Sequence, residues 1–279
     1  SMETEADGTV NQLNCPKLLI SADNHFLLKG DVSLQDLSHP QDAYIFGNLS
    51  NLYADPDGIA FFVRNLSKDY KGVPPALQHL GTISFRGEIS GYFTDLVTYG
   101  EVRTDIGTVK TDVKFSSDKE KGYFSYSGAV KTAEFELGKL LANDKFGKVT
   151  FNMDVKGSHY AKRYPSVTMK GLVASIDYSD YTYENITLDG EYKQGGFNGN
   201  VSFDDENGAI QLNGSINTAG KIPTFNFRAD VDHFRPNTLH LTPKYKDTEI
   251  SVKIKADFTG SSINDMNGEI NIDSLQYTA

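Results

Sequence analysis

The chain has 279 residues, of which 38% are hydrophobic and 23% are charged, and it includes 15 Tyr and 17 Phe. This aromatic content argues against a disordered chain. The formal net charge is −10 and no basic run occurs, which argues against a nucleic-acid partner, because phosphate binding needs clustered Lys and Arg.

Targeting and redox signals are few. Cys15 is the only cysteine, so no intramolecular disulfide can form. No run of about 18 apolar residues occurs, so we expect no membrane-spanning helix. The opening Ser1–Met2 suggests an internal piece of a longer protein, whose targeting segment lies outside this sequence.

Alternation of apolar and polar residues predicts β-strands, and in chain order it first appears at Ile83–Phe85. The segment 108–116 then places four residues on one face: Val109, Thr111, Val113 and Phe115. The segment 148–156 repeats this pattern with Val149, Phe151, Met153 and Val155. Successive side chains of a strand point to opposite faces, so each strand has one apolar and one polar face.

The second half of the chain continues the pattern. Shorter alternating segments are Ile186–Leu188, Val201–Phe203, Ile210–Leu212, Phe225–Phe227 and Ile270–Ile272. The segment 249–258 is longer and places five residues on one face: Ile250, Val252, Ile254, Ala256 and Phe258. Strands at a spacing of about ten residues are typical of sandwiches, barrels and solenoids.

Turn and helix signals lie between these segments. Glycine-containing turns are predicted at 119–122, 194–196, 205–208, Asn213–Gly214 and Asn267–Gly268. Loops are predicted around 55–58 and 235–237, and short helices at 74–80 and 137–143. The sequence therefore predicts an all-β protein with one or two very short helices. A loose repeat of strand, break, Gly and strand favours a repetitive sheet, and a β-meander with loop insertions is the alternative.

Motifs of known catalytic chemistry are absent from the sequence, including nucleophile elbows, phosphate-binding loops and paired zinc-binding histidines. His233 and His240 are seven residues apart, but no third ligand has a useful spacing. Asp55 and Asp57 lack the later bidentate Glu of a calcium loop, so turn chemistry is the better interpretation. We therefore expect no enzyme activity, no catalytic residue, no metal and no cofactor.

Several stretches resemble the repeat region of TamB-like proteins of the Bacteroidota, which belong to the AsmA-like family of the bacterial envelope. The stretches are 85–107, 135–141, 181–192 and 196–201. Together they cover about residues 80–279, whereas the first 80 residues match less obviously. We accordingly divide the chain into an N-terminal β segment, 1–80, and a continuous β-repeat segment, 81–279.

This resemblance implies a curled antiparallel or mixed sheet, elongated and shaped like a taco, with a hydrophobic groove. It implies a periplasmic segment of an inner-membrane-anchored subunit of the translocation and assembly module. The implied roles are phospholipid transport between the two membranes and support of outer-membrane protein assembly. An outer-membrane partner would be engaged through the parent protein.

The apolar faces are the candidate functional surface on this hypothesis, with lipid acyl chains as the ligand. The groove-lining candidates are Val109, Val113, Phe115, Val149, Phe151, Met153, Val155, Ile210, Leu212, Ile250, Val252 and Ile254. The alternation fits an open groove and a closed core equally well. Two other functions therefore stay open, an envelope scaffold with a closed core and a carbohydrate-active β-protein. Unpaired edge strands also predict edge-to-edge self-association.

Overall fold

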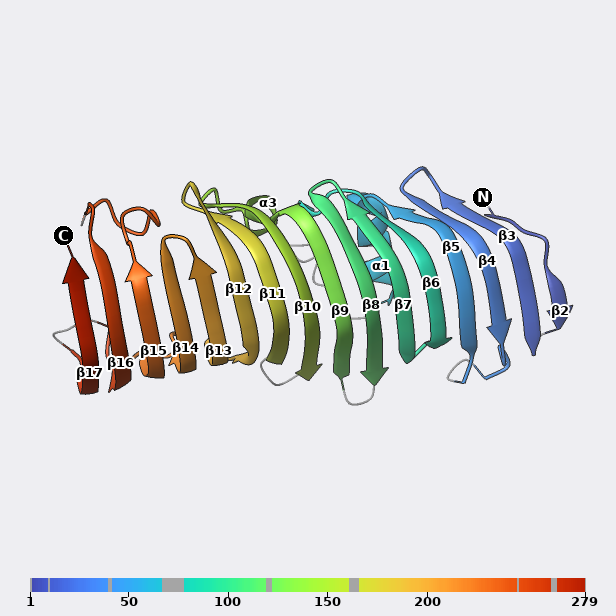
Figure 1. Cartoon of the computed structure of the whole chain (residues 1–279). Helices are drawn as coiled ribbons and strands as arrows, with labels where there is room; N and C mark the ends of the chain where they lie inside the picture. Colours follow the sequence, from blue (N-terminus) through green and yellow to red (C-terminus); the bar gives the residue numbers. More distant parts are fainter. Residues whose placement is uncertain are drawn as a thin grey trace. The chain divides into compact units, whose positions relative to one another are not determined.

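The computed structural model describes residues 2–9, 11–39, 42–66, 78–118, 122–160, 166–244, 246–261 and 265–278. The chain divides into two compact units, Ser1–Asp144 and Lys145–Ala279. Each unit is built on antiparallel strands that pair in chain order, as Figure 1 shows. The boundary predicted near residue 80 stays a prediction.

The first unit is a meander in which each strand from β3 to β9 pairs with the next. Its long strands are β3 (Gln12–Ala22), β4 (Phe26–Gln35), β5 (Tyr44–Ala54), β6 (Ile83–Tyr92), β7 (Asp95–Thr104), β8 (Gly107–Asp118) and β9 (Tyr123–Glu136). Two short strands, β1 (Met2–Glu3) and β2 (Asp7–Thr9), both pair with the outer edge of β3. This edge is therefore covered by the chain's own N-terminal segment.

The second unit is a meander from β10 to β17, again with antiparallel pairing throughout. Its strands are β10 (Phe146–Tyr160), β11 (Ser166–Tyr178), β12 (Tyr181–Lys193), β13 (Gly196–Asp205), β14 (Gly208–Asn217), β15 (Thr224–Phe234), β16 (Glu249–Thr259) and β17 (Asn267–Thr278). The all-β class and the antiparallel pairing are thereby confirmed. Every alternating segment named above lies inside one of the observed strands.

Helices are few, as expected. The predicted helix at 137–143 is confirmed as α3 (Leu137–Leu141). Most of the one predicted at 74–80 lies outside the described residues, as do the first three residues of the turn predicted at 119–122. Within the described part of the chain, no helix has the length and apolar character needed to cross a membrane.

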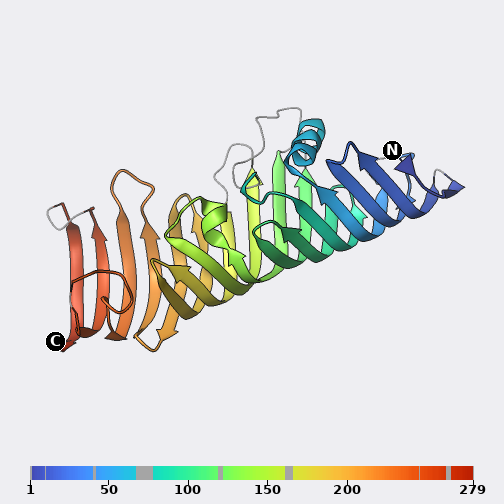
Figure 2. The ribbon, with the colours of Figure 1, turned by 90° about the horizontal axis from the view of Figure 1, so that it is seen from above.

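The loop predicted around residues 55–58 is wrong, because helix α1 (Pro56–Leu66) begins there. Asp55 caps this helix, since its Oδ1 accepts the backbone N–H of Gly58 at 2.8 Å. Proline suits the first helical position, where its missing N–H costs nothing. Figure 2 shows α1 at one side of the first unit's sheet. The residues that suggested a loop are therefore helix-start signals.

The turns predicted at Asn213–Gly214 and Asn267–Gly268 are also wrong, because both pairs lie in strands β14 and β17. Gly214 has φ 144°, and a Cβ there would lie 2.2 Å from the carbonyl oxygen of Asn226 on β15. Gly268 has φ 139°, with the same 2.2 Å approach to the Asp257 oxygen. These glycines let neighbouring backbones approach closely within a strand, which is the other structural use of glycine.

Candidate functional site

Cross-strand register gathers the apolar side chains of the second unit on one face of its sheet. Directly paired residues of antiparallel strands point to the same face. One row that crosses from β10 to β17 is Phe151, Val173, Ile186, Phe203, Ile210, Val231, Val252 and Leu275. The neighbouring row is Met153, Gly171, Leu188, Val201, Leu212, Ala229, Ile254 and Ile272. We call this surface the second apolar face.

Most side chains of the second apolar face are only partly buried. Val149, Phe203 and Ala256 are buried, whereas most of the others on β10–β16 are half-buried. On β17, the exposed fraction rises to 56% for Ile272 and 60% for Leu275. The elements described in this unit are all strands, so no helix among them covers the face.

A tyrosine cluster closes one end of the second apolar face. Tyr183 lies 4.8 Å from Tyr181 and 5.6 Å from Phe203, measured between ring centroids. The loop after β15 packs against it: the Tyr183 hydroxyl donates to the carbonyl oxygen of Leu239 at 2.6 Å, and Leu239 is fully buried. Burial, with a hydrogen bond to Asp205, raises the pKa of Tyr181 to about 12. These tyrosines are structural packing groups here.

His233 and His240 contact different partners. The Nε2 atom of His233 lies 3.2 Å from the carbonyl oxygen of Asp205, and the Nδ1 atom of His240 lies 3.0 Å from that of Ser179. Each ring is therefore held by a backbone oxygen of another segment.

The first unit also has an apolar face, and its centre is closed. Five buried residues pack together there: Cys15, Leu18, Val32, Leu49 and Phe85. Side chains from β3 to β7 surround them: Leu13, Ile20, Leu28, Leu34, Ile45, Leu52, Ile89 and Val102. Leu49 is only 1% exposed. We call this surface the first apolar face, and its centre is a packed core.

The same aromatic–glycine contact occurs on both faces. Gly87 pairs with Gly100 in the first unit, and a Cβ on Gly100 would lie 2.8 Å from the Phe85 ring. In the second unit Gly199 pairs with Gly190, and a Cβ on Gly190 would lie 2.5 Å from the Phe197 ring. Phe85 lies two residues before Gly87, and its ring occupies the space that a side chain on Gly100 would need. Phe197 likewise lies two residues before Gly199, and its ring occupies that space at Gly190.

The structure places all twelve predicted groove residues on the two apolar faces. Val109, Val113 and Phe115 lie on β8, where they pair with residues on β7: Val102, Thr98 and Leu96. The other nine lie on the second apolar face: Val149, Phe151, Met153, Val155, Ile210, Leu212, Ile250, Val252 and Ile254.

Sequence reasoning missed the contribution of β11 to the second apolar face. Val167, Met169 and Val173 pair with residues of β10 on that face. The signal was present, because these residues alternate with Thr168, Lys170 and Leu172. Gly171 in the middle of this segment interrupts the apolar run.

One cluster of potential metal ligands occurs among the described residues, at the start of α1. His25 Nδ1 lies 2.6 Å from Asp55 Oδ2 and 4.0 Å from Asp57 Oδ2. The hydrogen bond that the protonated ring donates to Asp55 raises the pKa of His25. The Gly58 backbone N–H, followed by His25, holds the pKa of Asp55 below its usual value. Both Asp55 oxygens are thus engaged within the protein, which makes the arrangement a helix cap tied to a histidine.

Comparisons with protein-family models, with curated proteins and with solved structures found no match to this chain. The function is accordingly argued from the geometry of the two faces.

Proposed function

We propose that the second apolar face binds lipid acyl chains. The supporting observation is that its apolar rows run across β10–β17 while most of their side chains stay half-exposed. A large exposed apolar surface marks a binding or interaction site. Acyl chains suit it because they need only apolar area, at about 25 cal/mol per Å² buried.

This function fits the resemblance to TamB-like proteins. On that proposal the chain is a periplasmic segment that contributes to a hydrophobic groove between the inner and outer membranes. The taco-like fold of the family would supply such a groove. Contact with an outer-membrane assembly partner would be made by the parent protein, and no bond would be made or broken.

A lipid-extraction experiment tests the proposal. The purified protein is extracted with organic solvent, and bound phospholipid is quantified by mass spectrometry. Val173→Asp places a charge on the second apolar face, and we expect it to reduce co-purified lipid at least fivefold. Leu172→Asp is the matched control, because the neighbouring Leu172 lies on the opposite face and is 40% exposed. Wild-type protein without phospholipid, or equal loss in both variants, contradicts the proposal.

An envelope scaffold is the second candidate, and the first apolar face supports it. Its centre is already filled by five buried residues, which leaves no room for a ligand there. A scaffold would act through surface contacts alone. A scaffold predicts that the purified protein carries no lipid, which the same extraction measures. It also predicts that detergent and lipid leave the fold unchanged.

A further inference from the structure

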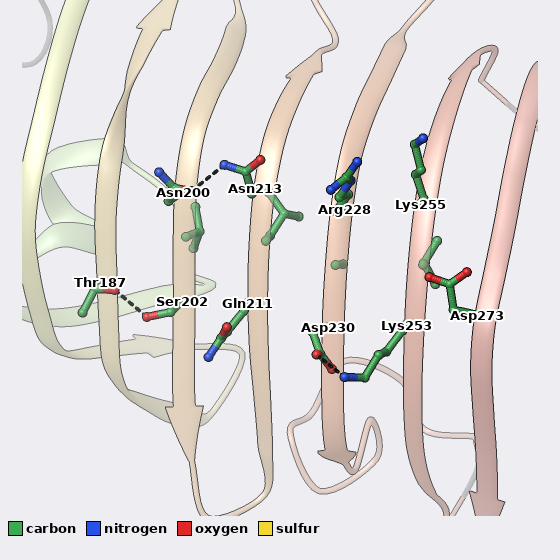
Figure 3. Close-up of a pocket in the computed structure, with 14 residues that line it drawn as sticks. Thr187, Asn200, Ser202, Gln211, Asn213, Arg228, Asp230, Lys253, Lys255 and Asp273 are labelled. Atoms are coloured by element: carbon green, nitrogen blue, oxygen red, sulfur yellow. Dashed lines mark hydrogen bonds and ion pairs between the residues drawn. The ribbon is translucent and has the colours of Figure 1, made fainter.

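The polar face of the second unit's sheet has a hollow of about 540 Å³, lined by residues of β12 to β17. Figure 3 labels the polar side chains that line it, among them Asn213, Arg228 and Lys255. In their strands these residues alternate with Leu212, Ala229 and Ile254 of the second apolar face, which also border the hollow. The polar side chains therefore lie on the opposite face of the sheet from the apolar rows proposed to bind acyl chains.

Two cations lie side by side in this hollow. Arg228 on β15 pairs directly with Lys255 on β16. On their outer sides Arg228 faces Asn213 and Lys255 faces Asn271. This row across β14–β17 therefore holds two positive charges and no carboxylate. Like charges placed directly opposite each other on a sheet are destabilising.

Two other lysines of this face are neutralised by cross-strand acids. Lys253 Nζ lies 2.8 Å from Asp230 Oδ2, and Lys170 Nζ lies 2.8 Å from Asp189 Oδ2. Arg228 and Lys255 form no such ion pair among the described residues. Asp230 is engaged by Lys253, and the other acid lining the hollow, Asp273, lies on β17 outside the row.

Neutral donors extend the row on one side. The side-chain amide of Asn213 donates to Oδ1 of Asn200 at 2.5 Å, which fixes both amides (Figure 3). One N–H of Asn213 and both N–H groups of Asn200 remain able to donate outward. The row thus presents a guanidinium, an ammonium and amide donors on adjacent strands.

We infer that this hollow is a phosphate-binding site formed by Arg228, Lys255 and Asn213. A guanidinium binds two phosphate oxygens at once, and an ammonium adds a point charge. Two cations match the double charge of a phosphate monoester better than the single charge of a carboxylate. Such a ligand also removes the repulsion between Arg228 and Lys255. The ligand class is a small phosphorylated molecule, and a lipid headgroup is the other source of the same chemistry.

Calorimetric titration with inorganic phosphate and with glycerol 3-phosphate tests this site. We expect Arg228→Gln/Lys255→Gln to weaken phosphate binding at least tenfold. Lys156→Gln/Lys170→Gln is the charge-matched control on the same sheet, and we expect a change below twofold. Thermal melts of both variants check folding, and phosphate should raise the melting temperature of wild type and control only.

Sedimentation with vesicles that contain phosphatidic acid, whose headgroup is a phosphate monoester, distinguishes the two sources. Binding of the free phosphates supports a small ligand. Binding to vesicles alone, lost in Arg228→Gln/Lys255→Gln, assigns the same site to a lipid headgroup. No binding by the wild type to either, or equal loss in the two double variants, overturns the inference.

Discussion

The two apolar faces have the same alternation of residues but differ in how much of it is buried. In the first unit Leu49, Leu18 and Val32 are at most 7% exposed and pack on one another. In the second unit the paired residues Leu212 and Ala229 are only half-buried. Alternation therefore determines which face is apolar, whereas the neighbours along the sheet determine whether that face becomes a core.

Side-chain volume accounts for part of this difference. Three paired glycines cross the second apolar face, Gly190, Gly199 and Gly214. They lie on consecutive strands β12, β13 and β14, so the row that they form carries no side chains of its own. The Phe197 ring covers Gly190, whereas Gly199 and Gly214 add no side chain to the face. In the first unit, Leu49 lies between Gly30 and Gly87 in such a row, and its side chain packs on Gly30.

The largest expected loss of stability comes from comparing a Leu→Ala substitution on each of the two apolar faces. Leu49→Ala should destabilise the first unit by about 3–4 kcal/mol, because it leaves a cavity in a packed core. Leu212→Ala should cost the second unit only about 1 kcal/mol, since its side chain is half-exposed. Hydrogen exchange read by mass spectrometry measures each unit separately. Equal losses of protection would show that the two faces are packed alike.

A second comparison substitutes alanine for the glycine under the aromatic ring on each face, Gly100 and Gly190. A methyl group on Gly100 would lie 2.3 Å from the carbonyl oxygen of Arg86, so Gly100→Ala must move backbone. On Gly190 it would lie 2.5 Å from the half-buried Phe197 ring, which can rotate away, and 2.7 Å from the carbonyl oxygen of Asn198, a milder backbone contact. We expect about 2–4 kcal/mol of destabilisation for Gly100→Ala and about 1–2 kcal/mol for Gly190→Ala.

Urea unfolding measures these two losses of stability. Gly220→Ala is the control, because its nearest neighbouring atom would lie 3.3 Å from the new methyl group. We expect a change below about 0.5 kcal/mol for it. If Gly190→Ala were as destabilising as Gly100→Ala, Phe197 would be held as firmly as Phe85.

The sequence predicted the strands and their faces because alternation is a local property. It placed Val149, Phe151, Met153 and Val155 on one face, as observed. It did not predict the difference in burial, because that depends on pairing between strands distant in sequence, such as Leu49 with Gly87. Glycine was the main source of error. Asn213–Gly214 has the composition of a tight turn, but its glycine serves a close approach of two strands.

The edge of β3 in the first unit and the edge of β17 in the second unit differ in how well they are covered. The edge of β3 is covered by β1 and β2, whereas β17 pairs with β16 alone among the described strands. An open edge with exposed apolar residues favours pairing with a second copy. A register shift of β17 opposite Lys253 and Ile254 limits this tendency, because bulges disturb edge pairing.

We therefore expect weak, concentration-dependent self-association through β17. Ile272→Lys should reduce it, because Ile272 is an exposed apolar residue of that strand. Gln276→Lys, on the polar face of the same strand, is the control and should reduce it less. Sedimentation velocity over a wide concentration range measures both. A wild-type protein that stays monomeric throughout would show that the register shift already protects the edge.

The smallest expected effect is the pH dependence of the contact between His25 and the start of α1. The pKa of His25 is raised from 6.5 by Asp55, so its stabilising contribution is complete below pH 6.5 and is lost as pH rises through the raised value. The pKa of Asp55 is lowered from 3.8, so its contribution is complete above pH 3.8 and is lost as pH falls through the lowered value. Both contributions are complete between these limits.

Helix α1 should accordingly be most protected from hydrogen exchange near pH 5, after correction for the intrinsic exchange rate, and less protected near pH 9. His25→Gln should remove this difference while the cap from Asp55 to Gly58 remains. The second unit serves as the internal reference in the same experiment, because His25 and Asp55 both belong to the first. If the protection of α1 in His25→Gln changed with pH as it does in the wild type, another titrating group would control the start of this helix.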